Sequence, residues 1–330
     1  MSLAATATPT PSTTAQLMAA EMAQVDQVIH RRLASEVVLI NQISHYIVSA
    51  GGKRIRPLLV LLFSNALGFK GPERFELAAI VEFIHTATLL HDDVVDESAL
   101  RRGRATANAL FGNAASVLVG DFLYSRSFQM MVSINRLKVL DVLADATNVI
   151  AEGEVLQRMN MHDPDISVDD YLRVIRYKTA KLFEASARLG AVIADAGPAI
   201  EEAAASYGRS LGTAFQLVDD LLDYEGATEK LGKNVGDDLR EGKPTLPLLI
   251  AMQRGTTEQS ELIRHAIEHG EVEKLAEIVE IVRATGAIAA TREAAREETR
   301  KAEAQIQLMA PSIYREALLN LCVQAVDRSF

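Results

Sequence analysis

Acidic residues at the end of one apolar stretch form a pattern that suits metal-assisted phosphate chemistry. In residues 90–97, Asp92 and Asp96 stand four positions apart and so share one face of a helix. Mg²⁺ takes oxygen ligands, usually one or two carboxylates together with substrate phosphates and water. A solvated acidic helix end is the commoner meaning of a lone motif of this kind, so the run by itself only suggests a metal–diphosphate site.

A second acidic stripe makes a metal site more favoured than a solvated helix end. Residues 215–223 repeat the pattern within another apolar helix, where Gln216, Asp219 or Asp220, and Asp223 form one stripe. Two acidic stripes that face each other across a helical core repel at high cost unless cations lie between them. The two stripes together therefore predict a Mg²⁺ site between two helices.

Basic residues follow the first acidic stripe. Arg101 and Arg102 come one or two turns beyond Asp96. Because guanidinium groups bind phosphate oxygens bidentately, the metal and these arginines could hold two separate diphosphates. Alternatively, Arg101 merely balances the charge of Asp96 and Glu97.

A glycine-rich bend supplies a second group of cations. Lys53, Arg54 and Arg56 stand between Gly51 and Pro57, where a helix begins and its backbone N–H groups add positive potential. No Walker pattern follows the bend. The bend is therefore predicted to be an anion site that is not a P-loop.

Two further sets of residues have a structural explanation as well as a functional one. Lys233 and Lys243 lie among glycines in the long loop 225–243, which suits a flap that closes over phosphates, or else a plain exposed connector. Lys178 and Thr179 lie inside a predicted helix, where a threonine hydroxyl facing a cavity could stabilise developing positive charge. A surface lysine beside a helical threonine is the commoner meaning of that pair.

The elements that must position these residues are helices. From Ala15 onward apolar residues recur every three or four positions, and alternating β-branched runs are scarce, so the sequence predicts an all-α fold. With no internal linker or repeat, residues 15–330 are expected to form a single domain after a disordered tail, residues 1–14. The expected helices are 15–32, 37–49, 56–66, 72–98, 115–134, 138–159, 168–195, 199–224, 245–253, 259–269, 272–285, 287–309 and 311–328.

Bulk composition excludes some classes of function. A net charge of -10 argues against a nucleic-acid partner, because phosphate backbones bind positive surfaces. The single cysteine, Cys322, cannot form an internal disulfide, which predicts a small buried side chain in a reducing cytoplasm. The longest apolar runs are far shorter than the roughly 20 residues of a membrane span.

The motifs resemble, in order and spacing, those of the trans-isoprenyl (polyprenyl) diphosphate synthases. The resemblance covers nearly the whole body of the chain and is closest to the octaprenyl diphosphate synthases of bacterial quinone synthesis. It rests on residues 51–57, 91–103, 178–179, 216–223 and 233–243.

That resemblance implies a fold, a cofactor and a role for each motif residue. It implies an isoprenoid-synthase bundle around a deep cavity, usually as a homodimer, with two to three Mg²⁺ ions. The implied metal-binding residues are Asp92, Asp96 and Asp219, supported by Asp93, Asp220 and Asp223, partly through water. The implied isopentenyl diphosphate ligands are Lys53, Arg56, His85 and Arg102. The implied allylic diphosphate ligands are Arg101, Lys178, Thr179, Gln216, Lys233 and Lys243. The implied catalytic set is Asp92, Asp93, Asp96, Arg101, Lys178, Thr179, Gln216 and Asp219.

The same resemblance implies a reaction and a product. The allylic diphosphate, expected to be farnesyl diphosphate, would ionise, the double bond of isopentenyl diphosphate would attack it, and a proton would leave to the departed diphosphate. Short-chain relatives carry a bulky aromatic residue four or five positions before the first aspartate, whereas this chain has Thr88 and Ala87 there. The expected product is about C40, with shorter, C45 or C50 products as alternatives. The candidate chain-length residues are Ile84, Ala87, Thr88, Phe128 and Met131.

Three rival functions fit less well. A terpene cyclase would not need the second set of diphosphate ligands that Lys53, Arg56 and Arg102 suggest. An HD phosphohydrolase would need further histidine and aspartate ligands, which the seven histidines do not convincingly supply. A non-catalytic partner subunit should have degraded acidic motifs, whereas this chain retains all of them. A long apolar product also suggests transient membrane contact during release.

Overall fold

The predicted all-α fold is confirmed. The structure, a computed structural model, describes residues 13–49, 51–101, 103–225 and 236–327. Within these ranges the only strands form one short antiparallel pair, β1 (Leu100–Arg101) with β2 (Arg104–Ala105). None of the helices in these ranges combines the length and the apolar content that crossing a bilayer requires.

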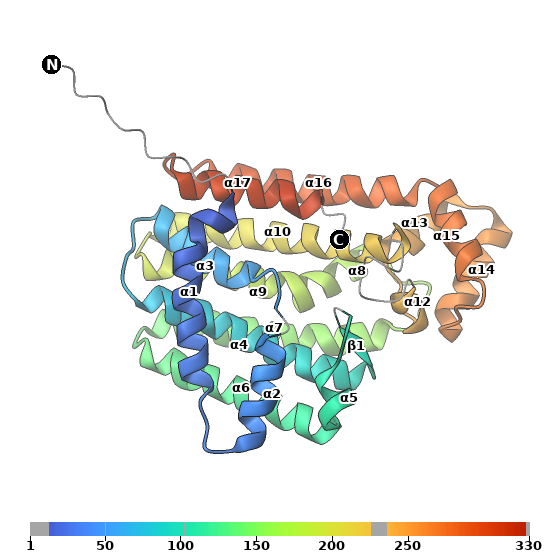
Figure 1. Cartoon of the computed structure of the whole chain (residues 1–330). Coiled ribbons are helices and arrows are strands. Elements are labelled where there is room, and N and C mark those ends of the chain that lie inside the picture. Colours follow the sequence, from blue (N-terminus) through green and yellow to red (C-terminus); the bar gives the residue numbers. More distant parts are fainter. Residues whose placement is uncertain (1–12, 50, 102, 226–235, 328–330) are drawn as a thin grey trace.

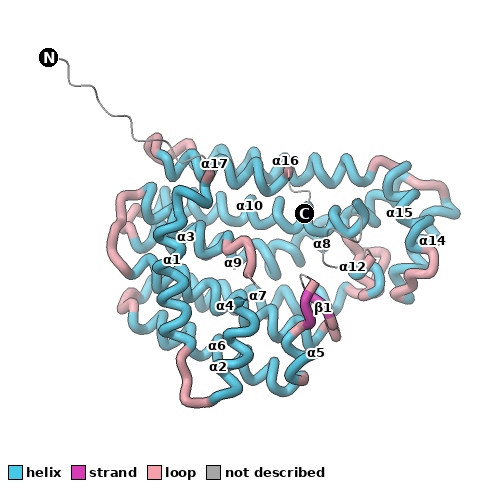
Figure 2. The backbone as a smooth tube through the Cα atoms, viewed as in Figure 1, coloured by secondary structure: helices cyan, strands magenta, loops and turns pink. Residues whose placement is uncertain are grey.

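The remaining elements are helices, joined mostly by short turns (Figures 1 and 2). They are α1 (Thr14–Leu33), α2 (Val38–Ser49), α3 (Ile55–Ala66), α4 (Glu73–Val95), α5 (Ala107–Phe111), α6 (Asn113–Ser133), α7 (Leu137–Asn160), α8 (Val168–Ile175), a π-helical turn (Arg176–Ala180), α9 (Lys181–Ile193), α10 (Pro198–Glu225), α12 (Asp237–Arg240), α13 (Leu246–Arg254), α14 (Thr257–His269), α15 (Leu275–Ala284), α16 (Ala287–Ile306) and α17 (Ile313–Val326).

Two long helices, α4 and α10, form the centre of the bundle. α4 packs against α3 and α6, while α10 packs against α9 and α16. Small and apolar residues surround the axis of α10 instead of forming one stripe, so the helix is buried on most sides. Figure 1 shows both helices running along the length of the molecule. The acidic stripes stand near the C-terminal end of each helix, and the bundle brings these two ends together.

A smaller apolar cluster lies beyond the main core. The main core joins α1, α3, α4, α6, α9 and α17. The smaller cluster joins the end of α10 to α12, α13, α14 and α15, with Tyr224, Leu239 and Ile263 among its fully buried members. In Figure 1 these helices form the orange end of the molecule. Their packing holds residues 236–243 against the end of α10.

The largest differences between the structure and the expected elements lie at three places. The long predicted helix 168–195 is interrupted by the π-helical turn, and the predicted loop 225–243 contains α12. The β1–β2 pair and α5 follow α4, which ends at Val95 and not at residue 98. Near the N-terminus, α1 begins at Thr14 because the Thr13 hydroxyl accepts a hydrogen bond from the N–H of Gln16. Residues 1–12 of the expected tail lie outside the described residues, and the single domain stays a prediction.

Candidate active site

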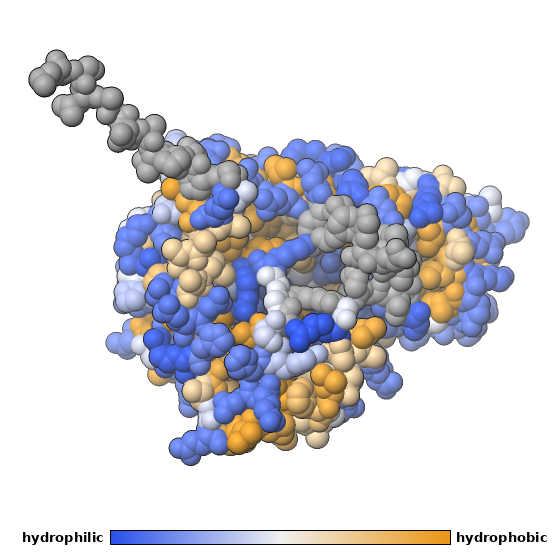
Figure 3. Space-filling view, viewed as in Figure 1, coloured by the Kyte–Doolittle hydropathy of each residue, from blue (hydrophilic) through white to orange (hydrophobic). Residues whose placement is uncertain are grey.

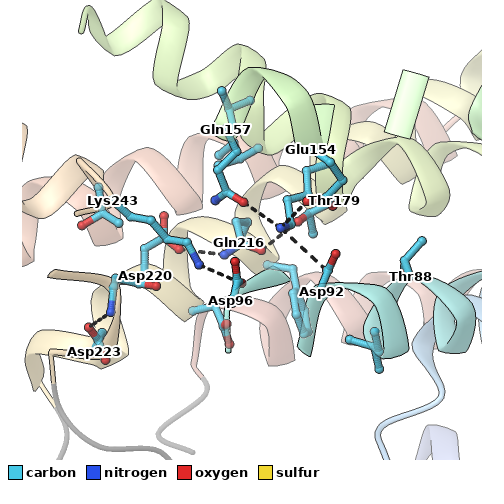
Figure 4. A pocket seen from close by; sticks show the side chains of 18 of the residues that line it. Thr88, Asp92, Asp96, Glu154, Gln157, Thr179, Gln216, Asp220, Asp223 and Lys243 are labelled. Carbon is cyan, nitrogen blue, oxygen red and sulfur yellow. Dashed lines mark hydrogen bonds and ion pairs between the residues drawn. The ribbon is translucent and has the colours of Figure 1, made fainter. Parts of the chain in front are cut away.

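A cavity of about 620 Å³ opens where the C-terminal ends of α4 and α10 approach α7, the π-helical turn and α12. Both acidic stripes line this cavity. Asp92 and Asp96 come from α4, while Asp219, Asp220 and Asp223 come from α10. Figure 4 shows side chains from these helices pointing toward one another across the cavity. Residues separated by more than 120 positions in the sequence thus form one acidic site.

Two lysines lie between the carboxylates. Lys178 Nζ is 3.7 Å from Asp92 Oδ2, and Lys243 Nζ is 3.3 Å from Asp96 Oδ2. Burial raises the pKa of the Asp92 carboxyl, Lys178 lowers it, and Asp96 raises it further. For Lys243, burial lowers the pKa, but Asp238 and other nearby carboxylates outweigh that effect and hold the pKa above its ordinary value. Positive charge among these aspartates is therefore favourable.

A hydrogen-bonded chain fixes the second stripe. The Tyr171 hydroxyl donates to Asp220 Oδ2 at 2.6 Å, and Gln216 Nε2 donates to Asp220 Oδ1 at 2.7 Å. The Thr179 hydroxyl in turn donates to Gln216 Oε1 at 2.9 Å. Burial, with Asp238 nearby, raises the pKa of Asp220 to about 8. Asp223 completes the stripe by accepting the backbone N–H of Asp238 at 3.3 Å, which ties α12 to α10.

Asp93 lies behind this cavity and does not line it. Its side chain is 1% exposed, and its Oδ1 accepts hydrogen bonds from Arg101 Nε at 2.9 Å and Nη2 at 2.7 Å. Arg101 therefore pairs directly with Asp93, although the charge of the nearby Asp96 also favours its positive charge. The pairing leaves the guanidinium on the cavity wall, oriented by a buried carboxylate.

The glycine-rich bend reaches the same cavity. Lys53, Arg56 and His85 line it, and the Arg56 guanidinium lies 4.5 Å from the centre of the Phe183 ring. Arg102 and Lys233, the other two predicted phosphate ligands, lie outside the described residues.

Several polar residues of the cavity were missed by sequence reasoning. Glu154 and Gln157 of α7 hold Lys178, each with an oxygen 2.6 Å from its Nζ. Burial, partly offset by Lys178, raises the pKa of Glu154 to about 7. Tyr171, Glu82 and Glu241 also line the cavity. The only signal in the sequence is the three-residue spacing of Glu154 and Gln157, which a solvated helix face would show as well.

The five chain-length candidates occupy two different environments. Thr88 lines the cavity, with its hydroxyl donating to the carbonyl oxygen of His85 at 2.8 Å. Ile84 and Ala87 are fully buried in the main core, where Met131 is also buried and Phe128 packs at its edge. Their role in product length stays a prediction.

The donor set fits magnesium held jointly with a diphosphate. Among the described residues, no three Asp, Glu, His or Cys side chains converge closely enough to hold a metal ion by themselves. Mg²⁺ ordinarily takes only one or two carboxylates and fills its other positions with phosphate oxygens and water. The carboxylates of α4 and α10 supply that number from each side of the cavity.

Comparison with known proteins gives a consistent result. Residues 37–283 match the model of a family described as polyprenyl synthetase. The chain is 57% identical to octaprenyl diphosphate synthase of Escherichia coli K12 over 95% of this chain and 97% of that protein. It is 54% identical to octaprenyl diphosphate synthase of Haemophilus influenzae over 94% of each chain.

Solved structures agree in fold. The polyprenyl synthase of Caulobacter crescentus, crystallised with calcium and isoprenyl diphosphate, superposes with a TM-score of 0.93 at 46% identity over 98% of this chain and 99% of that chain. A decaprenyl diphosphate synthase of Rhodobacter capsulatus superposes with a TM-score of 0.90 at 43% identity over 95% of this chain and 98% of that chain.

Proposed function

The chain belongs to the polyprenyl synthetase family, and from this premise we propose that it makes an all-trans octaprenyl diphosphate. It is a prenyltransferase, which joins isopentenyl diphosphate units head to tail onto an allylic diphosphate. The identity of 57% and 54% to two octaprenyl diphosphate synthases supports a product of about C40 over shorter or longer ones. Farnesyl diphosphate is the proposed primer, and the side chain of a quinone is the proposed use.

One observation supports this function above all others. Carboxylates from α4 and α10 share a cavity with cations from the glycine-rich bend, the π-helical turn and the segment after α12. A site for one diphosphate would not need cations at two separate places. The arrangement suits two diphosphate substrates, one beside the aspartates and one beside the bend.

The leaving diphosphate is assigned to the aspartate side. Asp92, Asp96 and Asp219 would hold two or three Mg²⁺ ions, which would supply Lewis acidity and positive charge there. Lys178 and Lys243 already stand among these carboxylates and can turn to phosphate oxygens. Preorganised positive charge of this kind stabilises the diphosphate as the allylic C–O bond breaks.

Arg101, Thr179 and Gln216 are assigned to orientation at that end. Arg101 is held by the buried Asp93 and presents its guanidinium to the cavity. Thr179 and Gln216 are joined by a hydrogen bond, so their oxygens are placed together near the site where positive charge develops. Exclusion of water around these residues would protect the allylic carbocation from reaction with water.

The second diphosphate is assigned to Lys53, Arg56 and His85 on the bend side. There the double bond of isopentenyl diphosphate faces the allylic carbon and attacks it. A proton then leaves to the departed diphosphate. The growing chain is proposed to extend past Thr88, away from the aspartates.

A homodimer in the cytoplasm is also part of the proposal. The family resemblance supports the dimer, and the single cysteine supports a reducing compartment. Figure 3 shows apolar side chains along the lower edge of the molecule, where α5 lies in Figure 1. Leu110 of α5 and Leu118 of α6 are 54% and 66% exposed. Size-exclusion chromatography with light scattering at micromolar concentration should give twice the chain mass, and a monomer there would contradict the dimer. Transient membrane contact during product release is proposed for the long apolar product.

The test is product analysis with the purified protein. Mg²⁺, labelled isopentenyl diphosphate and farnesyl diphosphate should give a dominant product near C40 after dephosphorylation. Asp92→Ala should lose roughly a thousandfold or more in rate, because a charge stabiliser of the transition state is gone. The exposed Asp141→Ala should keep full activity as the matched control. No incorporation from either a farnesyl or a geranyl primer would contradict the proposal and favour a non-catalytic partner subunit.

A further inference from the structure

A charged pair that lines the cavity, Arg54 with Glu82, has no substrate assigned to it in the proposed function. Arg54 Nη1 lies 2.9 Å from Glu82 Oε1, with side chains 16% and 13% exposed. The contact is an ion pair and not an aligned hydrogen bond. Arg54 Nη2 also reaches the carbonyl oxygen of Val48 at the end of α2, at 3.5 Å. One guanidinium thus links α2, α3 and α4.

Arg54 adopts a backbone conformation that arginine rarely takes. It stands immediately before α3 with φ 48° and ψ 35°, in the left-handed region. A non-glycine residue there costs free energy, so surrounding contacts must hold it. Arg54 makes no side-chain cap to α3, so its ion pair with Glu82 and its longer contact with the Val48 carbonyl oxygen are the side-chain contacts available to hold this geometry.

The position of the pair connects two functional groups of the cavity. Lys53 and Arg56 flank Arg54 in sequence, on the bend assigned to isopentenyl diphosphate. Glu82 precedes His85 by one turn of α4 and precedes Asp92 by ten residues on the same helix. The ion pair therefore sets how far the cations of the bend lie from the aspartate helix.

We propose that Arg54 and Glu82 are positioning residues that hold the glycine-rich bend against α4, and so set the affinity for isopentenyl diphosphate. This inference rests on the proposed function of the bend. The pair does not touch the reacting atoms. Loss of either partner lets the bend move away from α4, which separates Lys53 and Arg56 from the place where the homoallylic diphosphate must lie.

Three variants test the pair. Glu82→Gln removes the carboxylate charge at nearly constant size. Arg54→Asn removes the cation but tolerates the left-handed backbone. Arg54→Lys keeps one positive charge that can reach Glu82. The first two should raise the KM for isopentenyl diphosphate by about tenfold, and leave kcat and the KM for farnesyl diphosphate within about threefold. Arg54→Lys should stay within about threefold of wild type in all three constants.

A matched control separates positioning from stability. Glu201→Gln breaks another ion pair of a buried carboxylate, in which Glu201 Oε2 lies 2.5 Å from Nζ of the exposed Lys138, away from the cavity. It should lower the melting temperature without changing either KM. Calorimetric titration with isopentenyl diphosphate alone should reproduce the loss of affinity in Glu82→Gln and Arg54→Asn.

The possible results are distinguishable. If wild type incorporates isopentenyl units but Glu82→Gln and Arg54→Asn keep its KM, the positioning role is wrong. The same holds if both KM values rise together, as a general loss of structure would produce. If wild type shows no incorporation, the proposed function itself fails, whatever the variants do.

Discussion

Asp220 is held by a set of hydrogen bonds that no spacing rule would reveal. Its two oxygens accept from Tyr171 and Gln216, and Gln216 accepts from Thr179. Since Asp220 is buried with a pKa raised to about 8, each donor lowers the cost of its negative charge. The hydroxyl of Tyr171 is thus part of the second acidic stripe, although it comes from α8.

Tyr171→Phe should lower the free energy of unfolding by about 1–3 kcal/mol, because it leaves a buried oxygen of the Asp220 carboxyl group without its hydrogen-bond partner. Urea denaturation measures this change. Tyr177→Phe is the control, since within the described residues the contact of Tyr177 is that of its ring with the Arg173 guanidinium and not a hydrogen bond of its hydroxyl. Equal stability of the two variants would show that the Tyr171 hydroxyl does not support Asp220.

Cys322 should be inert toward thiol reagents in the native protein. It is buried, and burial raises the pKa of its thiol from 9.0 to about 12. Because this folded pKa lies above the unfolded value, the associated stability is complete below pH 9 and is lost as the pH rises toward 12. At pH 8, a disulfide reagent should react slowly with native protein and quickly in urea. Fast native reaction would contradict the burial, and the signal is unambiguous because the chain has one cysteine.

For single residues, the sequence predicted which charged side chains belong to the site better than it predicted which residues they contact. The aspartates of both stripes could be found because a four-residue helical spacing puts them on one face. The partner of Arg101 could not, because the chain turns after α4. Glu97 takes a positive φ of 50°, and the N–H of Ser98 bonds to the carbonyl oxygen of Asp93. This turn brings Arg101 back to Asp93.

At the scale of elements, the π-helical turn Arg176–Ala180 places Lys178 and Thr179. Turns of this type add a residue to a helix and often occur at functional sites. The turn lies against α7, where a Cβ added to Gly153 would come within 2.6 Å of the backbone nitrogen of Lys178. The absence of a side chain at Gly153 therefore sets the depth at which Lys178 enters the cavity.

Gly153→Ala should displace the π-helical turn and raise the KM for farnesyl diphosphate by about tenfold or more, since misplacement of a binding group by about 1 Å has large effects. Steady-state kinetics measures this change. Gly190→Ala is the matched control, because its Cβ would meet Phe63 Cβ at 2.6 Å in the core away from the cavity. The control should lose stability but keep its KM, and equal KM values for both variants would contradict this role of the turn.

The sequence predicted most helices but not their interruptions. Apolar residues keep a helical spacing through residues 168–195, so the pattern contains no sign that the backbone shifts from one hydrogen-bond register to another. Likewise, α12 is only four residues long, too short to show an apolar period. Its position depends on contacts with distant parts of the chain, such as the bond from the N–H of Asp238 to Asp223.

At the scale of the whole molecule, we expect the length of the product to depend on the space in the cavity beyond the aspartates. Thr88 is the one chain-length candidate that lines the cavity within the described residues. Thr88→Phe should shorten the dominant product by two or more isoprene units, because an aromatic ring would obstruct the growing chain. Thr88→Val, which has nearly the same size, should keep the wild-type product. Chromatography of the dephosphorylated products gives the result, and an unchanged distribution in Thr88→Phe would place the growing chain elsewhere.

The all-α fold could be predicted from the sequence, whereas the side chains that line its cavity could not. Helical periodicity and the scarcity of strand patterns were sufficient for the fold. The mutual rotation of the helices decides which side chains line the cavity and which pack in the core. Ala87 and Thr88 illustrate this limit, because these neighbours in sequence differ completely in exposure to the cavity.

The lysines among the aspartates have a consequence for how this site meets its substrates. Lys178 and Lys243 approach one carboxylate of the first stripe each, so the protein carries counter-ions of its own. A lysine that releases its aspartate can turn to a phosphate oxygen, and the freed carboxylate can then accept a divalent cation. Each lysine–aspartate ion pair is then replaced by two new ones, lysine with phosphate and aspartate with metal. The site can therefore bind a magnesium diphosphate without leaving any of these four side chains without a partner of opposite charge.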